Sequence, residues 1–163
     1  MGGQKLVRME EIYLNDLVTA CCRGVQALAA TKGVHLTCTA NEDISFAGDE
    51  ELLKRMTLNL IHNAIQYTFA DGAVSVRLTK EKDRACLTVR DTGVGIPAES
   101  VDRVFDRFYR VAESRARAEG GSGLGLAIVK LAAECHGGSV SLRSHLGSGS
   151  QFTVYLPLER NGA

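Results

Sequence analysis

The chain has 163 residues, with 19 Lys plus Arg against 19 Asp plus Glu, and 45% of its residues are hydrophobic while 23% are charged. This length and composition predict one globular domain with its own core and exclude a disordered chain. A net charge of about zero gives no reason to expect binding to nucleic acid or to an anionic membrane surface, and no apolar run approaches the roughly 18 residues of a membrane span.

The first predicted element is a helix over residues 14–32, where apolar residues recur at helical spacing. Gly33 stands directly after it, at the position where a left-handed residue commonly ends a helix. Asn15 or Asp16 is the expected N-cap, because a short polar side chain can accept a hydrogen bond from the first turn.

A second helix is predicted over residues 50–68, opened by Gly48 and Asp49. Its apolar residues form one stripe at steps of 100°. Asn59, Asn63 and Tyr67 follow one another at intervals of four along an edge of that stripe. Asparagine is a poor helix former, so two of them on one face suggest a function as well as core-edge packing.

The remaining elements follow from alternating strands, turn residues and glycine clusters. They are strands at 34–39 and 44–47, a hairpin of 74–80 with 85–90, a helix at 124–135, and a last hairpin of 139–144 with 151–156. This order predicts an α/β two-layer sandwich, with a mixed and mostly antiparallel sheet of about five strands and three helices on one face.

A glycine-rich loop at residues 120–127 (GGSGLGLA) enters the third predicted helix. Exposed backbone N–H groups at a helix start can hold phosphate. The loop is neither a Walker A loop, because no Gly-Lys-Ser/Thr follows, nor a dinucleotide-binding loop, because no strand directly precedes it. By itself it would equally fit a loop without a ligand.

Two other signals are each open to a structural reading. Asp91 ends an apolar strand and is followed by Gly93 and Gly95, so its carboxylate can accept a hydrogen bond from an amine such as that of adenine, or simply cap a turn. The amide oxygens of Asn59 and Asn63 can ligate Mg²⁺, or be satisfied polar groups at the edge of the core.

Taken in order, these segments resemble the ATP-binding catalytic domain of bacterial sensor histidine kinases, in the superfamily that includes DNA gyrase and heat-shock chaperones. The resemblance covers about residues 14–158. The matching segments are the N box at 59–67 (NLIHNAIQY), the first glycine box at 91–96 (DTGVGI), the F box at 104–110 (VFDRFYR), the second glycine box at 121–130 (GSGLGLAIVK) and a terminal element at 147–152 (GSGSQF).

The resemblance implies a Bergerat-type ATP-binding fold that binds ATP and Mg²⁺, and it implies a role for each matching residue. Asp91 would bind the adenine amine, Asn63 would ligate Mg²⁺, and residues from Phe105 to about Gly120 would form a lid. Catalytic roles fall to Asn59 and Arg110. Nucleotide contacts fall to Asn59, Asn63, Gln66, Tyr67, Asp91, Gly93, Gly95, Ile96, Arg110, Gly121, Ser122, Gly123, Leu124, Gly125, Leu126 and Ser150.

Two positions depart from the family pattern: Gln66 stands where Lys or Arg often contacts phosphate, and Phe69 stands where Pro is common. Members that hydrolyse ATP use a carboxylate four residues before the Mg²⁺-binding Asn. Here that residue is Asn59, whose amide is a very weak base. The resemblance therefore implies phosphoryl transfer from ATP to a histidine, rather than hydrolysis.

None of the four histidines, His35, His62, His136 and His145, lies in the acceptor signature of the family. The acceptor histidine and its dimerisation domain are thus expected to be separate partners, together with a response regulator. Two alternatives stay open: a non-catalytic nucleotide-sensing or partner-binding module, which Gln66 favours, and an anti-sigma serine kinase.

The expected organisation is a tail or linker from an upstream domain at residues 1–13, the catalytic domain at 14–158 and a C-terminal tail at 159–163. The absence of an apolar segment near the N-terminus predicts no secretory signal. The domain is expected in the cytoplasm without membrane contact of its own, and the full-length protein could be anchored in the inner membrane.

Overall fold

The computed structural model describes residues 8–109 and 125–158. The elements in chain order are β1 (Glu10–Tyr13), α1 (Leu14–Lys32), β2 (His35–Thr39), β3 (Ser45–Gly48), α2 (Glu50–Gln66), β4 (Ala73–Glu81), β5 (Arg84–Asp91), the 3-10 turn η1 (Ala98–Ser100), α3 (Gly125–Cys135), β6 (Ser139–His145) and β7 (Gly149–Pro157). The helices and strands predicted from the sequence are all present, within a few residues of their expected bounds.

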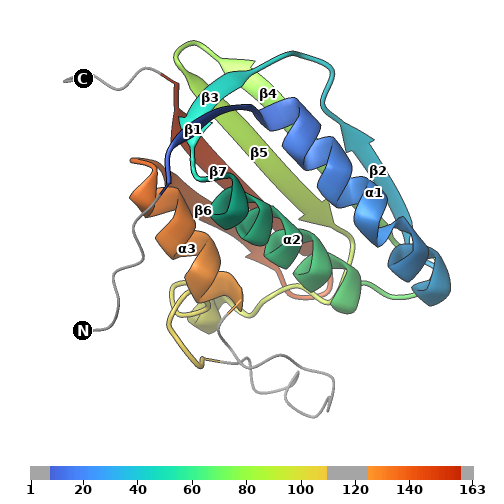
Figure 1. Ribbon diagram of the computed structural model, residues 1–163. Helices are drawn as coiled ribbons and strands as arrows, with labels where there is room; N and C mark the ends of the chain where they lie inside the picture. Colours follow the sequence, from blue (N-terminus) through green and yellow to red (C-terminus); the bar gives the residue numbers. More distant parts are fainter. Residues whose placement is uncertain (1–7, 110–124, 159–163) are drawn as a thin grey trace.

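The main sheet has five strands in the order β2-β4-β5-β7-β6. β2 pairs parallel with β4, and the other neighbours pair antiparallel. The helices α1, α2 and α3 lie beside one another over one face of this sheet (Figure 1). The predicted two-layer α/β sandwich is therefore confirmed.

The start of α1 corrects the predicted N-cap. Tyr13 precedes the helix and makes no capping bond with its side chain. The side chain of Asn15 instead accepts a hydrogen bond from the Ile44 N–H at 3.0 Å and donates one to Asp43 at 3.0 Å, and Asp16 lies in the first turn. Asn15 thus connects α1 to the segment before β3, a contact between residues far apart in sequence that a local pattern cannot predict.

Part of the expected N-terminal tail belongs to the fold. Residues 10–13 form β1, which pairs antiparallel with β3 in a separate two-stranded sheet. Its sequence, EEIY, has one partly buried apolar residue, Ile12, against exposed neighbours. Such a short polar strand forms because its partner is present, so its own sequence gives little strand signal.

The core lies between the helices and the sheet. In β4, Val74, Val76 and Leu78 alternate with exposed residues and face the helices, while Leu53 and Leu60 on α2 are completely buried. Because side chains alternate across a strand, every second residue of β5 also faces the helices, up to the end of the strand at the edge of the core. Asp91 stands at that edge.

No helix in the described part of the chain is both long and apolar enough to cross a bilayer.

Candidate functional site

The candidate site lies at one end of the sandwich. There the C-terminal end of α2, the N-terminal end of α3 and the turn after β5 come together (Figure 1). The end of α2 at Gln66 and the start of α3 at Gly125 are 59 residues apart in sequence, so long-range contacts hold these segments together.

Asp91 is a buried carboxylate, 5% exposed, at the end of β5. Its Oδ1 accepts hydrogen bonds from the N–H of Gly93 at 2.9 Å and from the N–H of Ser150, its cross-strand partner on β7, at 3.3 Å. Burial raises the pKa of Asp91, and the two N–H donors oppose that rise. Within the described residues, Oδ2 has no hydrogen-bond partner, so this oxygen is available to accept from a ligand.

The turn after Asp91 packs directly on the end of α2. The Val94 N–H donates to the carbonyl oxygen of Tyr67 at 3.1 Å. A Cβ atom on Gly93 would lie 2.0 Å from the same oxygen, so no other residue fits there without moving the helix end or the turn. This contact joins the first glycine box to the helix that carries Asn59 and Asn63.

The same turn is also held by the β6–β7 hairpin. Gly95 has φ +76°, and its missing side chain leaves room for the His145 carbonyl, which would be 2.1 Å from a Cβ. The Gly147 N–H donates to the Val94 carbonyl at 2.7 Å, and the Ile96 N–H donates to Ser144 Oγ at 2.7 Å. The backbone of residues 93–96 is therefore fixed on both sides.

The N-terminal end of α3 is attached to α2 through Asn59. Its side-chain amide donates to the carbonyl oxygen of Gly125 at 3.3 Å. Asn63 lies one helical turn further along α2, between this contact and the contact of Tyr67 with the glycine turn. Asn59 and Asn63 are both half-buried, and their spacing of four residues places them on the same side of α2.

The structure brings most of the predicted site residues into this region. Gln66 and Tyr67 are half-buried at the end of α2, Ile96 and Leu126 are half-buried against the core, and Ser150 is buried beside Asp91. His62 is exposed. The predictions for Arg110, Gly121, Ser122, Gly123 and Leu124, and for most of the proposed lid, fall outside the described residues.

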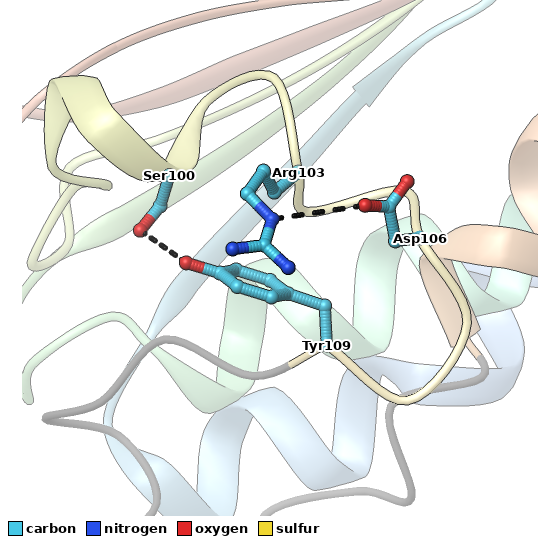
Figure 2. Close-up of polar contacts among 4 residues, drawn as sticks. All are labelled: Ser100, Arg103, Asp106 and Tyr109. Carbon is cyan, nitrogen blue, oxygen red and sulfur yellow. Dashed lines mark hydrogen bonds and ion pairs between the residues drawn. The ribbon is translucent and has the colours of Figure 1, made fainter.

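The described part of the F box, residues 104–109, contacts the residues just before it, as Figure 2 shows. The hydroxyls of Ser100 and Tyr109 are 2.7 Å apart, Arg103 forms an ion pair with Asp106 at 3.8 Å, and its guanidinium lies 4.7 Å from the centre of the Tyr109 ring. The ring of Phe105 meets that of Phe152 on β7 edge-on. These contacts attach residues 100–109 to one another and to β7. The side chain of Phe108, by contrast, is 63% exposed and does not contribute to the core.

Sequence reasoning missed two contributors. Ser144 on β6 contacts both the Ile96 N–H and Ser150, although 48 residues separate it from Ile96. The Nζ of Lys32 at the end of α1 donates to the carbonyl oxygens of Ile65 and Gln66 at 3.2 and 2.9 Å. The alternation of β6 would place Ser144 on the helix-facing side of the sheet, but only the strand pairing shows what it touches.

This arrangement has the chemistry of a nucleotide site. A carboxylate oxygen can accept from an exocyclic amine, an amide oxygen is a hard ligand suited to Mg²⁺, and the N-terminal end of a helix attracts phosphate. These groups come from four different elements, β5, β7, α2 and α3, which the backbone contacts above hold against one another.

The family model for "Histidine kinase-, DNA gyrase B-, and HSP90-like ATPase" matches residues 48–160. Among curated proteins, the chain is 43% identical over 146 residues to the sensor histidine kinase RppB of Synechocystis, an alignment that covers 89% of this chain and 32% of RppB. The chain spans well under half the length of the curated relatives it matches.

Solved structures of histidine kinases share this fold. The mycobacterial sensor histidine kinase MprB superposes with a TM-score of 0.78 at 31% identity, covering 91% of this chain and 97% of that one. Full-length ShkA in complex with AMPPNP superposes with a TM-score of 0.81 at 25% identity, covering 99% of this chain and 33% of that one.

Proposed function

The chain belongs to the family of histidine kinase-, DNA gyrase B- and HSP90-like ATPases, and from this premise we propose that it binds ATP with Mg²⁺ and is the part of a sensor histidine kinase that presents ATP to an acceptor histidine. Its likeness to kinases of this type, such as RppB and MprB, supports the proposal.

The observation that carries the proposal is the attachment of α2 at two points. Asn59 contacts the start of α3, and Tyr67 contacts the turn after Asp91, so the three motifs surround one region. We assign nucleotide contacts in it to Asn59, Asn63, Gln66, Tyr67, Asp91, Gly93, Gly95, Ile96, Gly125, Leu126 and Ser150. The complex of ShkA with AMPPNP, an ATP analogue, supports an ATP ligand.

In this proposal the Oδ2 atom of Asp91 accepts a hydrogen bond from the adenine amine. Gly93 and Gly95 bring the backbone close to the base, and the N-terminal end of α3 faces the phosphates. Asn63 is the proposed Mg²⁺ ligand. A single amide fits this ion, because Mg²⁺ keeps several waters and takes its other ligands from phosphate oxygens. The ion would neutralise phosphate charge during transfer.

We propose transfer to histidine rather than hydrolysis, because Asn59 supplies an amide where a hydrolytic site needs a base. The chain's own residues then bind and orient ATP, and Asn59 faces the phosphates from α2. In the transfer, the bond between the γ-phosphorus and its bridging oxygen breaks, a bond to the histidine nitrogen forms, and ADP leaves. The acceptor histidine lies on a separate dimerisation domain, and the phosphoryl group passes on to a response regulator.

The proposed setting is the cytoplasm. The proposed domain covers about residues 14–158, now with β1 in front of it, so the linker to an upstream domain would end before Glu10. The short terminal segment after residue 158 would be a tail. RppB is about three times as long as this chain, so a full-length protein of that size would have room for a membrane anchor outside the domain.

Calorimetric titration with ATP and Mg²⁺ tests the nucleotide site, and labelled ATP with the histidine-bearing hairpin of the same kinase tests transfer. We expect ATP binding, and an acid-labile, base-stable label on the hairpin. Absence of nucleotide binding would overturn the assignment. ATP binding without label would favour the second candidate, a nucleotide-sensing module.

Gln66 is the observation that favours this second candidate, because it places a neutral side chain where relatives often have a cation. The Gln66→Lys variant is therefore informative. We expect it to bind ATP about fivefold more tightly or better, since a charge-assisted hydrogen bond to phosphate exceeds a neutral one by about 1 kcal/mol or more. The titration that measures wild-type affinity checks this, and an unchanged Kd would show that position 66 does not reach the phosphates.

A further inference from the structure

Three polar residues form one row across the sheet at the candidate site. In the strand register, Asp91 on β5 is directly opposite Ser150 on β7, and Ser150 is directly opposite Ser144 on β6. Directly opposed residues project to the same face of the sheet. These three side chains therefore lie on the helix-facing side, next to the apolar row across the sheet that contains the buried Phe152. Ser144 has no role in the function proposed above.

The hydrogen bonds of Ser144 can be counted, because a hydroxyl has one proton. Its Oγ accepts from the Ile96 N–H at 2.7 Å and donates to the Gly149 carbonyl at 3.0 Å, since a carbonyl oxygen can only accept. With the Ser144 proton on the Gly149 carbonyl, the remaining contact, to Ser150 Oγ at 2.8 Å, is donated by Ser150.

This fixes the direction of the Ser150 hydroxyl. Its one proton points to Ser144, so only lone pairs of Ser150 Oγ remain for any other group. Asp91 also offers only acceptor atoms when it is ionised. Its Oδ1 accepts the hydrogen bonds from Gly93 and Ser150, and its Oδ2 accepts neither of them. The Asp91–Ser150 edge, by which we mean these two side chains, is thus built of acceptors alone.

We propose that Ser144 is a positioning residue that keeps the Asp91–Ser150 edge acceptor-only and thereby selects an adenine nucleotide over a 6-oxopurine nucleotide. The proposal deepens the function given above and rests on it. Adenine carries an amine donor at its 6-position, whereas hypoxanthine and guanine carry a carbonyl acceptor there. A 6-carbonyl that faces Asp91 and Ser150 finds no hydrogen-bond donor there, because the Ser150 proton points to Ser144. The buried acceptors are then left unsatisfied.

Removing the Ser144 hydroxyl frees Ser150 to rotate and to donate to a 6-carbonyl. The measurement is the ratio of Kd values for ITP and ATP, each titrated with Mg²⁺ against the full 163-residue chain. We expect wild type to prefer ATP at least tenfold, and Ser144→Ala to reduce this preference about fivefold or more. A loss of packing alone would weaken both nucleotides and leave the ratio unchanged.

Ser144→Thr keeps the hydroxyl and is expected to restore the wild-type ratio. Ser141→Ala is the matched control, because Ser141 lies on the same strand with its side chain exposed on the other face. If circular dichroism shows that Ser144→Ala does not fold, Ser150→Ala decides, since it removes the acceptor itself and should also lower the preference.

A ratio within twofold of wild type in folded Ser144→Ala, or in Ser150→Ala where the first variant does not fold, would overturn the role of Ser144 while leaving ATP binding intact. Absence of binding of either nucleotide by wild type would instead overturn the proposed function, and this inference with it.

Discussion

At the scale of single residues, Asp91 places a buried, hydrogen-bonded carboxyl group in the site. It is almost completely buried, and burial raises its pKa above the ordinary 3.8 although two N–H groups donate to it. A buried carboxylate without a cationic partner costs stability when it is ionised. We expect the position to be maintained for binding, at a cost to the fold.

The Asp91→Asn variant separates these two effects. The amide oxygen can still accept from Gly93 and Ser150, but the NH₂ group replaces the acceptor that would meet the adenine amine. We expect a loss of ATP affinity of about 10–100-fold, together with stability equal to or above that of wild type at neutral pH. Titration calorimetry and urea unfolding measure the two quantities.

The pH dependence of this difference follows from the sign of the shift. Because the folded state binds the Asp91 proton more tightly than the unfolded state, the group destabilises the fold above its raised pKa. The penalty shrinks as pH falls through that pKa towards 3.8 and is absent below it. The stability advantage of Asp91→Asn should therefore disappear in acid. An advantage that persists there would contradict a burial penalty.

At the scale of elements, α2 organises the site because both of its ends are held. Asp49 caps its first turn by accepting from the Leu52 N–H at 3.0 Å, and Lys32 donates to its last carbonyl oxygens. The hydrogen bond from the Leu52 N–H, followed by that from the Arg8 N–H, lowers the pKa of Asp49.

Removing this cap should destabilise the domain without changing its fold. For Asp49→Ala we expect a loss of about 0.5–2 kcal/mol in the free energy of unfolding at neutral pH, the usual effect of losing an N-cap. Asp49→Asn retains a capping oxygen and should lose less. Because the pKa of Asp49 is lowered in the folded state, its ionic contribution is present above 3.8 and is lost as pH falls through the folded pKa. Equal stability of Asp49→Ala and wild type would show that the cap is unimportant.

The packing of the glycine turn on α2 gives a sharper comparison between two glycines. Gly93→Ala places a Cβ 2.0 Å from the Tyr67 carbonyl, so we expect a destabilisation of roughly 2–4 kcal/mol and weakened ATP binding. Gly24→Ala, in the middle of α1 with nothing within 4 Å, should instead stabilise by about 0.5–1 kcal/mol. Chemical denaturation of both variants checks the opposite signs. A mild effect at Gly93 would mean that the turn can move away from α2.

Local patterns account for what could be predicted at this scale. The apolar periodicity of α2 and the glycine after α1 define elements through neighbouring residues, so the sequence alone predicts them within a few residues. β1 and the contacts of Asn15 depend on pairing with residues about 30 or more positions away. For the site, motif resemblance predicts Asp91 and Asn59, whereas Ser144 acts through strand register and Lys32 through the meeting of two helix ends, which no local motif encodes.

At the scale of the whole molecule, α3 joins the two ends of the sandwich. Its N-terminal end contacts Asn59, and just beyond its C-terminal end the buried ring of His136 accepts from the Asp49 N–H through Nε2 at 2.9 Å. The Nδ1 atom of the same ring lies 2.7 Å from the Ala132 carbonyl oxygen, which can only accept, so Nδ1 carries the proton and the ring is in the neutral tautomer that accepts at Nε2. One buried side chain thus connects α3 to the start of α2.

Replacing His136 should therefore affect stability and ATP binding differently. His136→Ala leaves a cavity and removes the acceptor of the Asp49 N–H, so we expect a loss of roughly 2–4 kcal/mol in the free energy of unfolding. The nucleotide contacts lie at the other end of α3, about 16 Å away at 1.5 Å per residue, so the Kd for ATP should stay within about twofold. His62→Ala, at an exposed position on α2, is the matched control for stability and should change it by no more than about 0.5 kcal/mol.

The double variant His136→Ala/Asp91→Asn should show additive changes in unfolding free energy, because distant sites without shared partners rarely couple. A large loss of ATP affinity in His136→Ala, or clear non-additivity, would mean that α3 transmits changes from one end of the domain to the other.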